Sequence, residues 1–127
     1  MLQSATVVMD DLQAAVTRLA APAARQLDYL ADLGVLPSVD ELALEFDDRF
    51  VLVPELEAAR LLTAEQVEAL RRIDRLLVAM SQQPDRWTAT ALAEHPDWAE
   101  LRRLAAVSLR TLGAPEPRDS GQDRAGA

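Results

Sequence analysis

The stretch TAEQVEALRRIDRLLVAMSQ, residues 63–82, decides the fold class of this chain. Its apolar residues recur three and four positions apart, which is the period of an amphipathic α-helix. Thr63 and Gln66 fit a capping box, in which each side chain bonds the free backbone amide of the other residue. The width of the apolar arc predicts that this helix lies at the centre of a helical bundle. The arc consists of Val67, Leu70, Ile73, Leu76, Leu77, Val78 and Met80.

The same periodicity continues on both sides of this stretch, and proline or glycine marks the breaks between segments. We therefore expect an all-α fold, a compact single-domain bundle of five to six helices over residues 1–113. Residues 114–127 are small and polar and lack an apolar anchor, which predicts a disordered tail. The other expected helical segments are 4–33, 38–50, 54–62, 88–94 and 96–112.

Three local features add detail to this expectation. Pro22 cannot donate a backbone hydrogen bond, so the first segment either kinks there or restarts with proline in its first turn. Ser38 and Glu41 fit a second capping box at the start of the 38–50 segment. The apolar run 50–53 has no plausible strand partner elsewhere in the chain, which favours a buried connector.

The composition excludes several kinds of chemistry. The chain contains no Cys and a single His, so disulfides, thiolate sites and a two-histidine metal site are all excluded. We expect no metal and no cofactor, and we interpret His95 as an exposed loop residue rather than a general base. No apolar run approaches the ~18 residues of a membrane span and no secretory leader is evident, which predicts a cytoplasmic protein with no membrane contact. All thirteen basic residues are Arg, a usage typical of GC-rich bacterial genomes.

The negative charge is concentrated in the N-terminal half. The chain has a formal net charge of −8, and residues 1–62 contain eleven acidic residues and only four Arg. In the 38–50 segment, Leu44 lies opposite the apolar face and between two stripes of carboxylates. An apolar side chain ringed by acids is typical of a binding patch for a basic protein partner. A solvated helix face with no binding role is the alternative. The carboxylates of this patch are Asp40, Glu41, Glu45, Asp47 and Asp48.

Asp74 falls inside the apolar arc of residues 63–82 rather than opposite it. Burying an unpaired carboxylate is costly, so a partner is required. We expect a structural role for Asp74, either in an ion pair with Arg18 or Arg25 or as a cap on another helix.

Two carboxylate pairs, Glu65 with Glu68 and Glu94 with Asp97, read as ExxE followed by ExxD. This pattern resembles the magnesium-binding motif of the all-α nucleotide pyrophosphohydrolases. In that family, carboxylates one turn apart on two facing helices hold Mg²⁺ ions that polarise a triphosphate. The resemblance implies a magnesium-dependent nucleotide hydrolase, which is the first alternative function. Pro96 places the second pair at a helix break, and this favours helix capping and solvation instead.

Residues 87–112 have the outline of a helix-turn-helix, with Arg102, Arg103 and Arg110 on the second helix. A DNA-binding regulator is therefore the second alternative. Phosphate binding needs a positive surface, whereas residues 63–112 contain seven acidic residues and seven Arg. We interpret Arg102 and Arg103 as part of a solvated face and expect no nucleic-acid partner.

With no catalytic set in view, the sequence favours a small acidic protein–protein interaction module without catalytic activity. An immunity-like inhibitor, an adaptor and an accessory subunit are examples of such a module. Its expected partner is a protein with a basic surface, bound through the acidic N-terminal half.

Overall fold

The computed structural model describes residues 5–34 and 38–113, and every regular element in these ranges is helical. The all-α bundle predicted from residues 63–82 and their surroundings is therefore confirmed. The expectation of a disordered tail over 114–127 lies outside the described residues. The elements are α1 (Ala5–Ala20), α2 (Ala23–Asp32), α3 (Glu41–Phe50), α4 (Val53–Ala58), α5 (Ala64–Ser81), the 3₁₀ turn η1 (Pro84–Arg86), α6 (Ala89–Glu94) and α7 (Pro96–Thr111).

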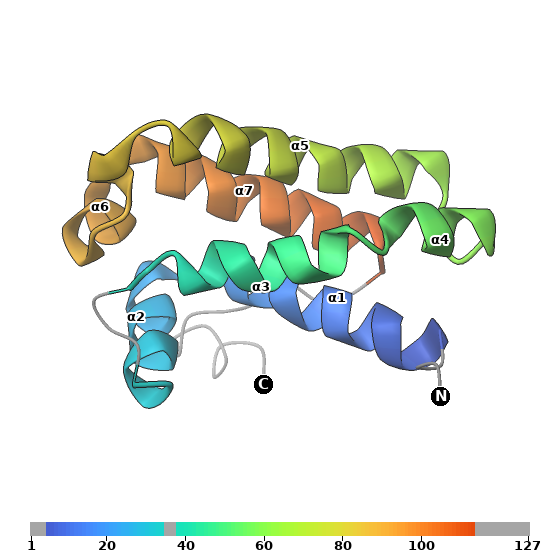
Figure 1. Ribbon diagram of the computed structural model, residues 1–127, viewed down its shortest axis with the longest axis horizontal. Helices are drawn as coiled ribbons and strands as arrows, with labels where there is room; N and C mark the ends of the chain where they lie inside the picture. The colour runs from blue at the N-terminus through green and yellow to red at the C-terminus, as the bar shows by residue number, and fades with distance from the viewer. Residues whose placement is uncertain (1–4, 35–37, 114–127) are drawn as a thin grey trace, which may run out of the picture.

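The central helix of the bundle is α7, which packs against both α1 and α5. The sequence placed α5 at the centre, but α5 lies beside α7 and leaves one of its own faces open. Figure 1 shows α5 and α7 running antiparallel along the molecule, with α2 and α6 at one end and α4 at the other. Helix α3 packs chiefly on α1 and more lightly on α5. A stretch of surface between α3 and α5 is therefore left without close helix packing.

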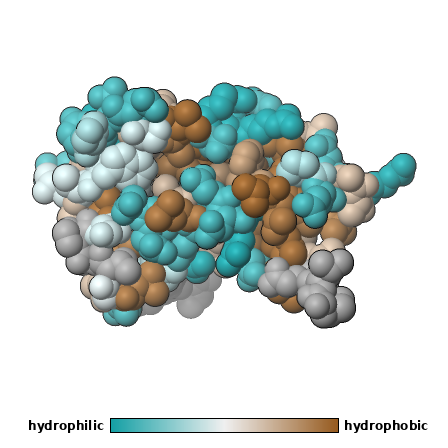
Figure 2. All heavy atoms as spheres, viewed as in Figure 1, coloured by the Kyte–Doolittle hydropathy of each residue, from teal (hydrophilic) through white to brown (hydrophobic). Residues whose placement is uncertain are grey.

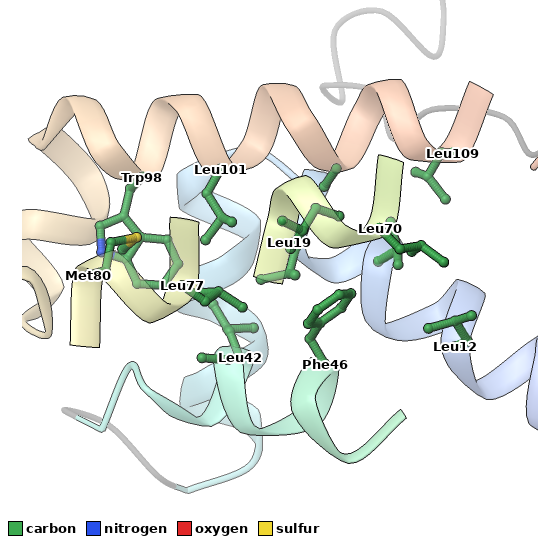
Figure 3. Close-up of a cluster of buried hydrophobic side chains, with 14 of the residues drawn as sticks. Leu12, Leu19, Leu42, Phe46, Leu70, Leu77, Met80, Trp98, Leu101 and Leu109 are labelled. Atoms are coloured by element: carbon green, nitrogen blue, oxygen red, sulfur yellow. The ribbon is translucent and has the colours of Figure 1, made fainter. Parts of the chain in front are cut away.

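The core is built from apolar side chains that α1, α3, α5 and α7 direct toward one another (Figure 3). Fully burying one Leu, Ile, Met or Phe side chain stabilises a fold by ~1.5–3 kcal/mol. Leucine therefore contributes about as much per residue as phenylalanine, and the core of this chain depends little on aromatic residues. Val78, which the sequence placed in the buried arc of α5, is instead 57% exposed. The buried side chains labelled in Figure 3 are Leu12, Leu19, Leu42, Phe46, Leu70, Leu77, Met80, Trp98, Leu101 and Leu109.

The predicted capping box at the start of α5 is confirmed. The backbone amide of Gln66 donates to Oγ1 of Thr63 at 3.1 Å, and the backbone amide of Thr63 donates to Oε1 of Gln66 at 2.8 Å. The Nε2 of Gln66 also donates to the carbonyl of Thr111 at 2.8 Å. The cap therefore joins the beginning of α5 to the end of α7.

Pro22 separates α1 from α2 completely. It stands at the N-cap of α2 with φ −57° and ψ 151°, one position before the first turn in which the sequence placed it. The extended ψ angle turns the chain, so α2 leaves the direction of α1 (Figure 1).

A buried glutamine bridges this break. Gln26 is only 1% exposed, and its Nε2 donates to the carbonyls of Arg18 and Leu19 in the last turn of α1, each at 3.0 Å. Its Oε1 accepts a hydrogen bond from Nη1 of Arg102 at 2.9 Å, and the same nitrogen donates to the carbonyl of Leu92 at 3.1 Å. This polar network connects α1, α2, α6 and α7.

Two local predictions were wrong. Helix α3 begins at Glu41 after a backbone turn, in which the Glu41 amide donates to the Ser38 carbonyl at 3.3 Å, so the Ser38 and Glu41 capping box does not form. The 50–53 run is not a buried connector, because Val51 is 68% exposed and Val53 already belongs to α4.

Candidate functional site

A groove of about 530 Å³ lies between α3 and α5 and ends at Trp87. Each helix contributes a stripe of residues with helical spacing, since side chains three and four positions apart share a face. Leu44 and Val51 come from the α3 side, and Val78 from α5. In Figure 2, apolar surface reaches the outside among polar side chains over α3 and α5. The apolar lining of this α3–α5 groove includes Leu44, Phe50, Val51, Leu77, Val78 and Trp87.

Three carboxylates border the α3–α5 groove. Asp40 and Asp47 lie on the α3 side and Asp74 on the α5 side. Within residues 5–34 and 38–113, no ion pair or side-chain hydrogen bond engages any of the three. Partial burial of the Asp47 carboxyl raises its pKa, and the charges of Asp74 and then Asp48 raise it further. The groove therefore carries negative charge that no described cation neutralises.

The side chains of the groove offer hydrogen-bond acceptors and no free donors. The Nε1 of Trp87 already donates to the Met80 carbonyl at 3.0 Å. The hydroxyl of Ser81 donates to the Val78 carbonyl at 2.6 Å. The remaining polar side chains of the lining are carboxylates, which accept only when ionised. A ligand that reaches into this groove must supply the donors itself.

The structure divides the predicted acidic patch into two parts. Asp40, Leu44 and Asp47 face the groove, and Leu44 is 48% exposed as expected. Glu41 is half-buried, and Asp48 is exposed outside the groove lining.

Glu45 turns away from the groove and serves the fold. The Nε of Arg18 donates to Oε1 of Glu45 at 2.8 Å, and the hydroxyl of Tyr29 donates to its other oxygen. The Arg18 guanidinium also lies over the Tyr29 ring, 4.8 Å from the centroid. Burial and the bond to Glu45 raise the pKa of Tyr29. Glu45 is thus a tertiary anchor between α3, α1 and α2, and unlike Asp40 and Asp47 it lies outside the lining of the α3–α5 groove.

Asp74 does not have the role that the sequence indicated. Arg18, one of its two expected partners, pairs with Glu45 instead. Asp74 is half-buried at the edge of the groove rather than enclosed in the core, so the cost of burying an unpaired carboxylate does not apply in full. The sequence also missed another α5 residue of the site, Val78. The signal for it was an apolar arc wider than one packing face requires.

The two carboxylate pairs of the ExxE and ExxD pattern do not meet. Glu65 and Glu68 lie at the start of α5, beside the end of α7, as the bond from Gln66 to Thr111 shows. Glu94 and Asp97 lie at the opposite end of the molecule, where α7 begins (Figure 1). At 1.5 Å per residue, about thirteen residues of α5 separate the two ends by ~20 Å.

Two carboxylates of this pattern, Glu68 and Asp97, are paired with nearby arginines. Arg75 donates to Glu68 at 2.7 Å, and this bond lowers the pKa of Glu68. Asp97 accepts from Nε of Arg86 at 2.8 Å. Across the part of the chain that the structure describes, no three His, Cys, Asp or Glu side chains are grouped so that they could hold a metal ion. The resemblance to the pyrophosphohydrolase motif therefore has no counterpart in three dimensions.

The residues of the helix-turn-helix outline are largely structural. His95 is a half-buried N-cap of α7 rather than an exposed loop residue, since its Nδ1 accepts from the Asp97 amide at 3.0 Å. Arg102 belongs to the Gln26 network instead of a solvated face, and burial lowers its pKa. Arg103 is paired with Glu100 one turn earlier, at 2.8 Å.

Comparisons with models of protein families, with curated proteins and with solved structures find no match to this chain. Among the described residues, none of the helices combines the length and the apolar character needed to cross a membrane.

Proposed function

We propose that this protein is a cytoplasmic protein–protein interaction module that binds a basic partner through the α3–α5 groove. Inhibitors, adaptors and accessory subunits are proteins of this kind. The observation that carries the proposal is the combination of an apolar groove with three unneutralised carboxylates on its borders. Carboxylates are the only ionisable groups in this lining, which suits the recognition of cations rather than the binding of phosphates.

The exposed apolar side chains of the groove are suited to be binding anchors. Leu44, Val51 and Val78 are 48%, 68% and 57% exposed, and all three belong to one depression. Partly exposed apolar side chains that border one concave surface can pack against apolar side chains of a partner. In known interfaces a few central apolar residues supply most of the affinity, while rim charges speed association and select partners.

The test compares groove variants with matched controls in the native host. Affinity-tagged parent protein and the variants Leu44→Ala and Asp47→Arg are used to isolate bound proteins. Leu61→Ala and Asp28→Arg are the controls, since Leu61 is 42% exposed away from the groove and Asp28 is an exposed acid on α2.

A partner retained by the parent and both controls and lost by both groove variants is the expected result. Titration calorimetry with that purified partner should then show at least a tenfold weaker Kd for Leu44→Ala, with an unchanged melting temperature. If every partner is retained equally by groove and control variants, the proposal is wrong.

A further inference from the structure

We infer that the segment which occupies the α3–α5 groove is an amphipathic α-helix with basic residues on both sides of its apolar stripe. This inference rests on the proposed function and names the kind of partner segment that it requires.

The hydrogen-bonding capacity of the groove favours a helix over an extended segment. An extended peptide brings backbone carbonyls that need donors, and the Trp87 indole and Ser81 hydroxyl are already bound to carbonyls of this protein. Leaving such carbonyls buried without donors is costly. A helix satisfies its own backbone groups, so only its side chains must match the groove. The described residues also contain no strand whose edge an extended segment could join.

The dimensions of the groove correspond to about three helical turns. From Asp40 to Val51 the α3 side spans eleven residues, which is ~16 Å at the helical rise of 1.5 Å per residue. The α5 side, from Asp74 to Ser81, spans about two turns. A helix laid between α3 and α5 packs on both, and it would bring apolar residues three and four positions apart onto Leu44 and Val78.

The position of the charges determines where the basic residues belong. Asp40 and Asp47 are seven residues apart, or ~10 Å along a helix, and lie on one border of the groove. Asp74 lies on the opposite border. Arginine binds a carboxylate through two parallel hydrogen bonds and brings the donors that the groove lacks. A bound helix therefore carries two basic residues about two turns apart on one flank and a third on the other.

The probes for this inference are three synthetic peptides of about sixteen residues, titrated into the full chain. The first places Leu in one helical stripe with Arg on both flanks. The second has the same composition, with Leu and Arg distributed around the helix. The third replaces each Arg of the first by Glu. The readouts are the fluorescence of Trp87, which lies at the end of the groove, and the gain in helical circular dichroism on binding. Trp98 is kept because it is fully buried and its ring packs edge-on against Trp87, and a Trp87→Phe variant shows which part of the signal comes from Trp87.

The amphipathic Arg peptide should bind at least tenfold more tightly than the redistributed peptide, with a gain of helix. The Glu peptide should not bind at the same concentrations. Leu44→Ala should weaken the first peptide about tenfold and Asp74→Asn severalfold, whereas Leu61→Ala and Asp28→Asn should leave its Kd unchanged.

Three outcomes would overturn the inference. The first is equal affinity for the amphipathic and redistributed peptides, which shows that an amphipathic helix is not needed. The second uses an alkylguanidine as an additional probe that cannot form a helix, and it is an affinity of this compound equal to that of the amphipathic peptide. The third is the absence of peptide binding. All three leave the groove proposal in place if a host partner still depends on Leu44 and Asp47. Loss of that dependence contradicts the proposed function itself.

Discussion

Replacing Gln26 with Met should destabilise the protein strongly, although no binding surface changes. The Gln26 amide makes three hydrogen bonds in a site where it is 1% exposed, two to carbonyls of α1 and one from Arg102. Met retains most of the side-chain volume, so the loss comes from the polar contacts. A net hydrogen bond contributes ~1 kcal/mol, and a bond to a charged group ~1.5–3 kcal/mol. We therefore expect a loss of about 3–5 kcal/mol in the free energy of unfolding.

Urea denaturation followed by helical circular dichroism measures this loss. A typical domain is stable by only ~5–15 kcal/mol, so the shift in the midpoint should be large. The double variant Gln26→Met with Arg102→Met tests the mechanism, because removing both partners should cost less than the sum of the single losses by ~1–3 kcal/mol. A Gln26→Met variant within ~0.5 kcal/mol of the parent, an ordinary surface effect, would refute the network as a source of stability.

Three further predictions concern other positions. The fold raises the pKa of Asp47, so the folded chain binds more protons than the unfolded chain between the two pKa values, and stability falls as the pH rises through that window. Asp47→Asn should accordingly raise the melting temperature slightly at neutral pH. The difference from the parent should vanish near pH ~3, where the parent carboxyl is protonated. A lower melting temperature of Asp47→Asn at neutral pH would contradict the raised pKa of Asp47. Ser108 is fully buried and its hydroxyl has no hydrogen-bond partner, so Ser108→Ala should stabilise by ~1 kcal/mol in urea denaturation, and destabilisation would reveal a partner for the hydroxyl. Arg60 has a φ angle of 64°, in the left-handed region that favours glycine. Arg60→Gly should therefore stabilise the protein by ~0.5–1 kcal/mol, and its melting temperature should be higher than that of Arg60→Ala.

The sequence predicted those parts of the fold that depend on neighbouring residues. The Thr63 and Gln66 cap involves residues three positions apart, and the apolar period of residues 63–82 belongs to one helix. Ser38 and Glu41 have the same spacing, but a backbone turn brings the Ser38 carbonyl to the Glu41 amide before the helix begins. A cap motif indicates a chain reversal near a helix start, and the residue at which the helix begins depends on the packing around it.

The site depended on contacts that sequence spacing does not contain. Glu45 lies outside the groove because its carboxylate binds Tyr29 and Arg18, which is twenty-seven residues earlier in the chain. Asp74 lines the groove because α3 packs only lightly on α5 at this point. The distance between two helices cannot be predicted from the spacing of residues within either one. The ExxE and ExxD match failed for a related reason, since spacing within each pair says nothing of the antiparallel direction of α5 and α7.

The exposed anchors of the groove and the buried Gln26 network involve different residues, and this separation affects how the protein can evolve. Substitutions at exposed positions such as Leu44 and Val78 change stability little, because these side chains are about half exposed already. A lineage can therefore alter its choice of partner by successive changes in the groove while each intermediate remains folded. Substitutions at Gln26 or Arg102 are selected against instead, because they lower the free energy of unfolding. Related sequences should therefore vary first along the border between α3 and α5.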